Sequence, residues 1–511
     1  MTTSDDPQLY GGWQPERSSY LGELSLGGLV LVAGAGLAVM MPIYLHRWVG
    51  EIAAVPVALV LLALVYVPVR GISGVEWLSL AVRHQINVAR RRNVFLSGLF
   101  APRRSDGTQP MDLPGVLARL RLLSVPTGAG EELGVVFDPR TNCYSAVMEV
   151  RFPGLALVDT TKANARVGAW GAFLRSHCVE GGPIVRIAVH DRSLPDDGTA
   201  LMAWTAKHLD PTAPQHVRDL VADLTADAAP VAAARRTYLT ITMSATRARL
   251  AVKGAGGGEL GACAVLVREL LAMQSSIAGA DLEVVTHLTS RDLAEVIRTA
   301  YDPHAIPVLA AHAAAAQAPD WQGLPPGVEE ELAGPAAAER HWSHYRHDHA
   351  TSRTYHVHRW PEGRVYASVL QPLLKSGGDV TRSFTMTYEC LSPRTARTVL
   401  RRERTKRDVK RRVRAQGGKI ESLDERQDLA HAQEQDSARV AGHGIVRFTG
   451  LVTVTVDSHD PHRLATAHAQ MLKDAADSGV VLRELVGVQD AAFAAAALPL
   501  GLGLPEKRRA L

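Results

Sequence analysis

The glycine-rich segment Gly256-Gly257-Gly258 comes nearest to a phosphate-binding loop in this sequence. Such a loop needs a lysine for the β- and γ-phosphates and a serine or threonine hydroxyl for magnesium. Ala262 and Cys263 stand at those positions. The segment therefore predicts a glycine turn that opens a helix at Leu260. Because the sequence also lacks H-E-x-x-H, G-x-S-x-G and the kinase motifs, we expect no nucleotide hydrolysis, no catalytic residue and no cofactor.

A group of histidines could supply metal ligands. Its members are His341, His344, His347, His349, His356 and His358. His356 and His358 would share one face of a strand, and imidazole is a ligand for zinc. No cysteine lies nearby, and Arg346, Arg353 and Arg359 share the segment. We therefore predict a polar surface strand and no metal site, with zinc binding as the alternative.

The strongest charge feature runs from Arg394 to Lys419, where twelve residues are Lys or Arg and the acids are Glu403 and Asp408. After Gly417-Gly418 the sign reverses, so two oppositely charged helices are predicted to pair as an arm from Arg394 to Val440. We expect this arm to dock a partner, with nucleic-acid binding as the alternative. The candidate contact residues are Arg401, Arg402, Arg404, Arg407, Arg411, Arg412 and Arg414.

Two uncharged segments near the N-terminus predict membrane spans. Leu24 to Leu45 covers 22 residues and Ile52 to Val69 covers 18. As helices they would measure roughly 33 Å and 27 Å, enough for a bilayer core. The short loop from His46 to Glu51 predicts an antiparallel transmembrane hairpin. A buried helical hairpin in a soluble core is the alternative, although core helices rarely run this long without a polar face.

Basic residues predict the orientation of the hairpin. The arginines after the second segment are Arg70, Arg83, Arg90, Arg91, Arg92, Arg103 and Arg104. Arg47 alone lies in the loop, so the positive-inside rule places both termini in the cytoplasm of a cell-membrane protein with two spans. The stretch from Val75 to Arg92 predicts an interfacial helix near anionic lipid, with a solvated linker helix as the alternative. Gly34 and Ala38 have a spacing that permits a homo-oligomer.

Composition limits the remaining possibilities. The chain has 511 residues, 46% apolar and 21% charged, which is enough for a core and for two or three domains. A net charge of +4 excludes a globally basic nucleic-acid coat. The four cysteines stand far apart, which excludes a disulfide framework and indicates a reducing compartment.

Periodicity after Met111 predicts an α+β fold: a transmembrane hairpin followed by cytoplasmic mixed α/β domains with a protruding helical arm. The predicted strands are 134–137, 143–152, 183–190, 237–244, 282–288, 354–360, 383–390, 446–456 and 480–485. The predicted helices are 160–179, 199–209, 212–224, 260–278, 291–300, 365–374, 464–476 and 489–497. The predicted organisation is a cytoplasmic segment (1–23), the hairpin (24–69), a basic juxtamembrane segment (70–110), a first α+β domain (111–307), an Ala/Pro-rich linker (308–340) and a second α+β domain (341–511) that carries the arm (394–440).

Five short motifs carry a family resemblance. They are Tyr10-Gly11-Gly12-Trp13, Ala300-Tyr301-Asp302-Pro303, Arg359-Trp360-Pro361, Gly450-Leu451-Val452-Thr453-Val454-Thr455 and Phe493-Ala494-Ala495-Ala496-Ala497-Leu498-Pro499-Leu500-Gly501. In this order they resemble an actinobacterial membrane protein family encoded in conjugation or type IV-like secretion clusters. The two-span start is similar to PrgI-family proteins. The rest is similar to the N-terminal domain of the type IV secretion assembly ATPase, in which the last motif precedes the motor domain.

The resemblance implies a membrane-anchored, non-enzymatic structural or recruiting subunit, because the sequence ends at Leu511 without the motor. Its expected partners are membrane lipids, a secretion or conjugation ATPase and other subunits of the machine. Two alternatives remain: a type VII secretion membrane subunit of the EccE kind, and a membrane-tethered enzyme with an unrecognised site.

Overall fold

The computed structural model describes most of the chain outside its ends and the predicted arm. The described residues are 31–37, 40, 44, 48–69, 72–98, 112–127, 130, 132–152, 158–195, 204–205, 207–210, 212–228, 233–318, 320–361, 365–366, 368–375, 380–399, 401, 405 and 444–503.

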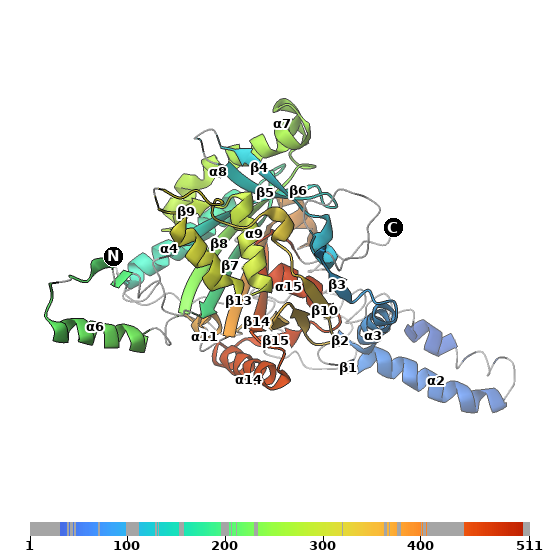
Figure 1. Cartoon of the computed structure of the whole chain (residues 1–511). Helices are drawn as coiled ribbons and strands as arrows, with labels where there is room; N and C mark the ends of the chain where they lie inside the picture. Colours follow the sequence, from blue (N-terminus) through green and yellow to red (C-terminus); the bar gives the residue numbers. More distant parts are fainter. Residues whose placement is uncertain are drawn as a thin grey trace.

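One large antiparallel sheet organises the described chain (Figure 1). Its main path runs β3-β10-β11-β12-β14-β13-β7-β8-β6-β5-β4, with β15 beside β12 and β9 beside β6. The strands are β3 (Val94–Leu96), β4 (Arg121–Pro126), β5 (Glu132–Asp138), β6 (Cys143–Arg151), β7 (Ile184–Pro195), β8 (Ala233–Ser244), β9 (Glu283–His287), β10 (Ala337–Arg340), β11 (Tyr345–His347), β12 (Ala350–Arg359), β13 (Val380–Cys390), β14 (Val446–Val456) and β15 (Val481–Glu484). The predicted mixed α/β class is therefore confirmed.

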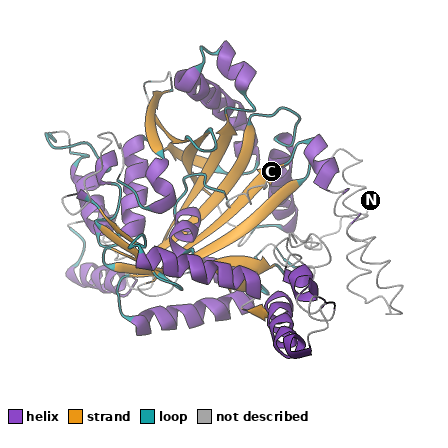
Figure 2. Ribbon diagram, turned by 90° about the vertical axis from the view of Figure 1, so that its right-hand side faces the viewer, coloured by secondary structure: helices purple, strands orange, loops and turns teal. Residues whose placement is uncertain are grey.

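Helices accompany this sheet, and a separate two-stranded ladder precedes it. The helices are α2 (Trp48–Tyr66), α3 (Gly74–Ala89), α4 (Thr160–Ser176), α6 (Gln215–Ala228), α7 (Arg249–Gly254), α8 (Gly258–Gly279), α9 (Ser290–Tyr301), α10 (Ala305–Ala315), α11 (Gln371–Leu374), α14 (Pro461–Asp477) and α15 (Gln489–Ala497), with 3-10 turns η2 (Gly115–Arg119) and η4 (Glu330–Leu332). The ladder pairs β1 (Pro68–Val69) with β2 (Ile72–Ser73). Figure 2 shows helices on both sides of the long, twisted strands.

The two predicted α+β sets share this sheet. Strand β7, from the first set, pairs antiparallel with β13, from the second, from Arg382 opposite Ser193 to Glu389 opposite Arg186. The predicted linker 308–340 contains most of α10, the 3-10 turn η4 and strand β10. Its alanines form a helix because alanine has the highest helix propensity of all residues.

Two other predictions about local structure are wrong. The predicted helix 365–374 is reduced to the four residues of α11, because Pro372 lies in its first turn and disfavours helix before it. The predicted polar surface strand is β12, which lies between β14 on one side and β11 and β15 on the other. Most of its side chains are buried, and His356 and His358 are half-buried.

Threonine alternates with apolar residues along the central strands, and this pattern gives the sheet two different faces. In β8, Leu239 and Ile241 pack with α4 and α8 in one core. The intervening Thr240 points to the opposite face, where its hydroxyl donates to the Pro499 carbonyl at 2.9 Å. In β13, the Thr385 hydroxyl donates in the same way to the Ala496 carbonyl at 2.8 Å. Thr385 therefore satisfies a carbonyl in the last turn of α15, which has no helical partner, and Thr240 satisfies a carbonyl just after the helix.

Helix α15 lies at the centre of a second core. The Phe493 ring is fully buried and lies 5.1 Å from the Tyr301 ring and 4.8 Å from the His347 ring, centroid to centroid. Leu498, directly after the helix, belongs to the same cluster. The C-terminal motif of the sequence is therefore an interior element of the fold.

We predict that Leu498→Ala lowers the free energy of unfolding by about 2–5 kcal/mol, since the side chain is only 2% exposed and its removal leaves a cavity. The matched control is Leu260→Ala on α8, where the leucine is 85% exposed and the change should stay within about 0.5 kcal/mol. Urea unfolding of both variants measures the difference. Equal effects would contradict the buried position of the C-terminal motif.

Buried histidines make the fold sensitive to acid. Burial lowers the pKa of His190 to about 3, with Arg192 adding to the effect, and burial lowers the pKa of His347 to about 4. The unfolded chain, with histidine pKa values near 6.5, therefore binds more protons than the folded chain below that pH. The stability that each histidine contributes is complete above about pH 6.5. It falls by about 1.4 kcal/mol per pH unit as the pH drops towards the folded pKa.

We predict that this slope appears in urea unfolding between about pH 7 and about pH 5, and that His190→Asn and His347→Gln each reduce it. His462→Gln, at an exposed position, is the control and should keep the slope of the unmodified protein. A slope that neither buried substitution changes would contradict the assignment.

Candidate functional site

Helix α2 carries an exposed apolar surface. Val57, Leu59 and Val60 are 52%, 61% and 60% exposed, and Tyr66 at its end is also exposed. The helix has 19 residues and is therefore about 28 Å long. A surface of this kind is costly in water and suits a bilayer or a protein partner.

The predicted spans differ from the described helices at their ends. The second was predicted from Ile52 to Val69, but α2 begins at Trp48 and ends at Tyr66. Val67 precedes Pro68, which disfavours helix at that position, and Pro68 begins strand β1. Of the first span, Leu24 to Leu45, residues 31–37, 40 and 44 are helical, and the others lie outside the described residues.

Among the described helices, α8 is the one that is long and apolar enough to cross a bilayer by length and composition. Its buried residues, which include Leu266, Leu270 and Met273, pack in the core beneath the sheet. Arg268 and Glu269 lie in the middle of the same helix. Because core helices of globular proteins have this apolar face, α8 is a core helix.

The segment from α2 to β3, which we call the anchor segment, connects α2 to the sheet. A Cβ added to Gly74, the first residue of α3, would lie 2.7 Å from the Leu64 carbonyl oxygen of α2. Glycine therefore permits a close approach of the two helices. Ser73 caps α3 by accepting a hydrogen bond from the Glu76 amide at 3.3 Å.

Strand β3 joins the anchor segment to the edge of the sheet. It pairs antiparallel with β10, from Val94 opposite Glu339 to Leu96 opposite Ala337. The Arg340 amide donates to the Asn93 carbonyl at 2.8 Å and extends the ladder. The anchor segment extends from the side of the body opposite α6 (Figure 1).

Trp342 holds α3 against the body. Its ring makes edge contacts with Trp77 at 5.8 Å and with His84 at 5.4 Å, measured between centroids. Its carbonyl accepts a hydrogen bond from the Gly487 amide at 2.7 Å, just before α15. Trp342 therefore links the anchor segment to the chain that leads into the central helix.

Charged groups surround this contact. Arg340 donates to Asp490 on α15 at 3.0 Å, and both side chains are largely buried. Burial lowers the pKa of His84, and the neighbouring Arg340 and His341 act in the same direction against the weaker, opposite effect of Asp490. The uncharged form of His84 is therefore favoured, and its ring packs against Trp342.

The base of the predicted arm is fixed at the end of strands β13 and β14. The Leu391 amide donates to the Ile445 carbonyl at 3.1 Å, and the Cys178 thiol at the end of α4 contacts the same carbonyl at 3.5 Å. Arg401 is helical and exposed. The other six candidate contact residues lie outside the described residues: Arg402, Arg404, Arg407, Arg411, Arg412 and Arg414. All four cysteines are free in the structure.

The glycine segment is a turn that opens a helix, as predicted. Gly256, Gly257 and Gly258 have φ values of 99°, 74° and 62°, a region that favours glycine, and α8 begins at Gly258. The glycines therefore have a conformational role between α7 and α8.

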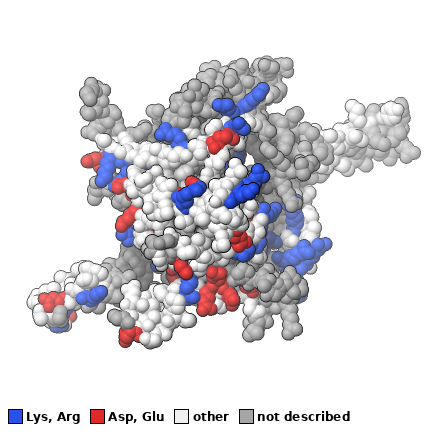
Figure 3. Space-filling model, turned by 90° about the horizontal axis from the view of Figure 1, so that it is seen from above, with Lys and Arg blue, Asp and Glu red and all other residues white. Residues whose placement is uncertain are grey.

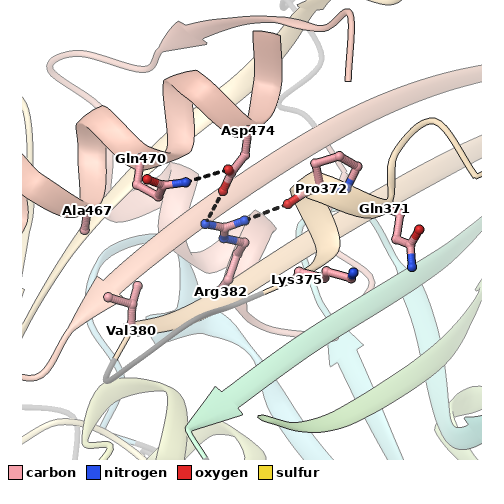
Figure 4. Close-up of a pocket in the computed structure, with 8 residues that line it drawn as sticks. All are labelled: Gln371, Pro372, Lys375, Val380, Arg382, Ala467, Gln470 and Asp474. Atoms are coloured by element: carbon pink, nitrogen blue, oxygen red, sulfur yellow. Dashed lines mark hydrogen bonds and ion pairs between the residues drawn. The ribbon is translucent and has the colours of Figure 1, made fainter. Parts of the chain in front are cut away.

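A hollow of about 600 Å³ lies between α11, β13 and α14 (Figure 4). Arg382 is its central charged residue. Its guanidinium contacts Asp474 at 2.8 Å and donates to the Pro372 carbonyl at 3.0 Å. Gln470 also donates to Asp474, at 2.8 Å. The polar groups of this hollow therefore hold the three elements together.

The predicted histidine group separates into distinct sites. His341 and His344 stack on each other with ring centroids 4.4 Å apart. His347 is buried, and His349 lies beside Asp302 and His304, whose candidate ligand atoms are all within 4.8 Å of one another. Sequence reasoning missed this last group because its members come from two regions of the chain. The signal was present in the Tyr301-Asp302-Pro303 motif and in the histidine group.

Basic and acidic side chains are intermingled on the face shown in Figure 3. This described face therefore lacks the single-sign surface that nucleic-acid binding favours. Comparison with known proteins found no family model and no curated sequence that matches the chain.

We predict that Trp342→Ala loosens the anchor segment without unfolding the sheet. Losing two aromatic contacts costs about 1–3 kcal/mol, so amide exchange in α3 should accelerate by roughly 5- to 150-fold while β7 and β13 stay protected. Trp321→Ala is the matched control, because Trp321 contacts His312 on α10. Unchanged exchange in α3 would contradict the role of Trp342.

Proposed function

We propose that this protein is a membrane-anchored, non-enzymatic subunit of a conjugation or type IV-like secretion apparatus that recruits a motor ATPase. The observation that carries the proposal is the anchor segment. The exposed apolar helix α2 is connected through α3 and β3 to the edge of the large sheet. Insertion of α2 in a bilayer would therefore hold the whole sheet at the membrane.

Charge supports the orientation. Arg83, Arg90, Arg91 and Arg92 lie on or just after α3, beyond the end of α2. Such a group favours the cytoplasmic surface, where anionic lipids are enriched. The two-span hairpin with cytoplasmic termini is therefore part of the proposal, and the sheet would lie in the cytoplasm.

The assignment to this class of machine rests on the order of the motifs and on what they do in the fold. Phe493 and Leu498 belong to the motif that precedes the motor in the assembly ATPase, and here they lie in the core behind the sheet. In the sequence the predicted arm lies between β13 and β14, and the described residues that flank it, Leu391 and Ile445, are joined to each other and to Cys178 after α4. A rigid body with a charged arm suits recruitment, because charged groups mainly accelerate association.

Leu59→Arg tests the membrane attachment. In a bilayer, an arginine near the centre of a span costs about 2.5–3.5 kcal/mol, so the variant should shift from the carbonate-resistant membrane fraction to the soluble fraction. The matched control is Leu250→Arg on α7, where the leucine is 80% exposed and the change should leave the membrane fraction intact. Identical behaviour of the two variants would contradict the attachment through α2.

The recruitment is tested separately in the organism that carries the gene. The tagged full chain is purified in detergent and probed for a motor ATPase, and transfer of DNA or protein is measured after deletion of residues 401–436. We expect the deletion to abolish co-purification and transfer while the protein remains in the membrane. Normal transfer by the deletion strain would contradict the recruiting role.

A further inference from the structure

The corner between α9 and α10 presents two side chains capable of binding a metal. Asp302 follows the last residue of α9 in an extended conformation, and Pro303 prevents the helix from continuing. His304 then occupies the N-cap position, directly before α10. Asp302 is 9% exposed, whereas the His304 side chain is 57% exposed. The corner therefore combines a buried carboxylate with an accessible imidazole.

The turn between β11 and β12 brings a third side chain to this corner. His347 pairs with Ala350, so Asp348 and His349 form a two-residue turn, with Asp348 at a φ of 44°. One ring nitrogen of His347 lies 2.5 Å from the Tyr301 carbonyl and the other 2.7 Å from the Ser352 hydroxyl. This buried bridge fixes the turn against the end of α9 and places His349 beside Asp302.

The ligand atoms are close together, and one of them is unused. The candidate atoms of Asp302, His304 and His349 all lie within 4.8 Å of one another. Oδ2 of Asp302 accepts a hydrogen bond from Arg298 at 2.9 Å, but its buried Oδ1 accepts none. That oxygen lies 3.9 Å from Nδ1 of His349. Two ligands of one zinc ion are about 3.4 Å apart in tetrahedral geometry, so a small rotation of His349 would bring both into range.

Neighbouring groups hold these side chains in place. Asp457, after β14, lies 2.6 Å from Nε2 of His304, and such carboxylates fix the orientation of metal-binding imidazoles. Arg298 bridges Asp302 and Asp348, at 2.9 Å and 3.3 Å. The contacts therefore support the ligands from α9, the β11–β12 turn and the loop after β14.

We propose that Asp302, His304 and His349 bind one divalent transition-metal ion, for which Zn²⁺ is the best match. Two imidazoles with one carboxylate favour zinc over magnesium or calcium, which prefer ligand sets made of oxygen alone. The ion joins the α9–α10 corner to the β11–β12 turn. The His304 and His349 side chains are 57% and 70% exposed, so water completes the coordination.

The test is metal binding by the full chain in detergent after chelator treatment. Zn²⁺ is titrated against a chromophoric chelator, and Co²⁺ is added separately to record its visible absorption as a probe of the ligand geometry. We expect one ion per chain. His349→Gln and His304→Gln should each weaken binding by at least about tenfold and reduce the Co²⁺ signal. Both side chains are more than half exposed, so these variants should fold.

Two further variants sharpen the result. Asp457→Asn should weaken binding by about 10–100-fold, because it disturbs the support of His304 and leaves the three ligands in place. His462→Gln, at an exposed position on α14, should bind as the unmodified protein does. Zn²⁺ should also raise the melting temperature of the unmodified protein and leave that of His349→Gln unchanged. The proposal is overturned if the unmodified protein binds no ion, or if His349→Gln and His304→Gln bind as tightly as it does.

Discussion

Strands β7 and β13 pair along eight successive residues, and the rest of the structure depends on this pairing. Two strands nearly two hundred residues apart in sequence form the middle of the sheet, with β8 beyond one and β14 beyond the other. The sheet then offers a continuous face, wide enough for α15 to contact strands from both halves. The two halves of the described chain are thereby joined in one sheet. Its hydrogen-bonded strands run without a break from β3 at one edge to β4 at the other.

Helix α15 completes this body because the face beneath it is polar. The hydroxyls of Thr240 and Thr385 come from the two halves of the sheet, and both bond to carbonyls at the end of α15 or just after it. Gln489, at the start of the helix, also exchanges hydrogen bonds with the backbone of Thr354 at 2.9 Å and 3.2 Å. Buried polar groups are costly unless they are paired, so a shift of α15 that broke these hydrogen bonds would be unfavourable. The polar face therefore allows the helix fewer positions than an apolar face would. The central strands alternate threonine with valine, leucine or isoleucine because one face must supply hydrogen-bond donors to α15 and the other must pack in an apolar core.

Residue periodicity along the sequence predicted many of the strands and helices. It did not predict which strands pair with each other. Strand β14 and helix α15 have the predicted bounds because their alternation and alanine content are unambiguous. The pairing of β7 with β13 could not be predicted, since periodicity says nothing about which strands are neighbours. The Ala-rich start of the predicted linker forms most of helix α10, in keeping with the high helix propensity of alanine, and this helix begins after the corner at Pro303. At the corner itself, Asp302 and His349 are brought together by contacts between distant residues, among them the hydrogen bond of His347 with Tyr301 and the Arg298 bridge to Asp348.

Strand β3 closes an edge of the sheet and, under the proposed function, also connects the sheet to the membrane-attached helix α2. A free sheet edge presents unpaired amides and carbonyls that invite association with other chains. Here β10 is covered by β3, which follows α3 directly, so the strand that protects this edge also comes from the segment that leads to α2. Release of the anchor segment would therefore expose an edge as well as detach the body. Trp342 makes two contacts that hold α3 in place. Its ring packs against Trp77 of α3, and its carbonyl accepts a hydrogen bond from the Gly487 amide just before α15. The contacts that hold α3 against the body are therefore also the contacts that keep β3 paired with β10 at this edge.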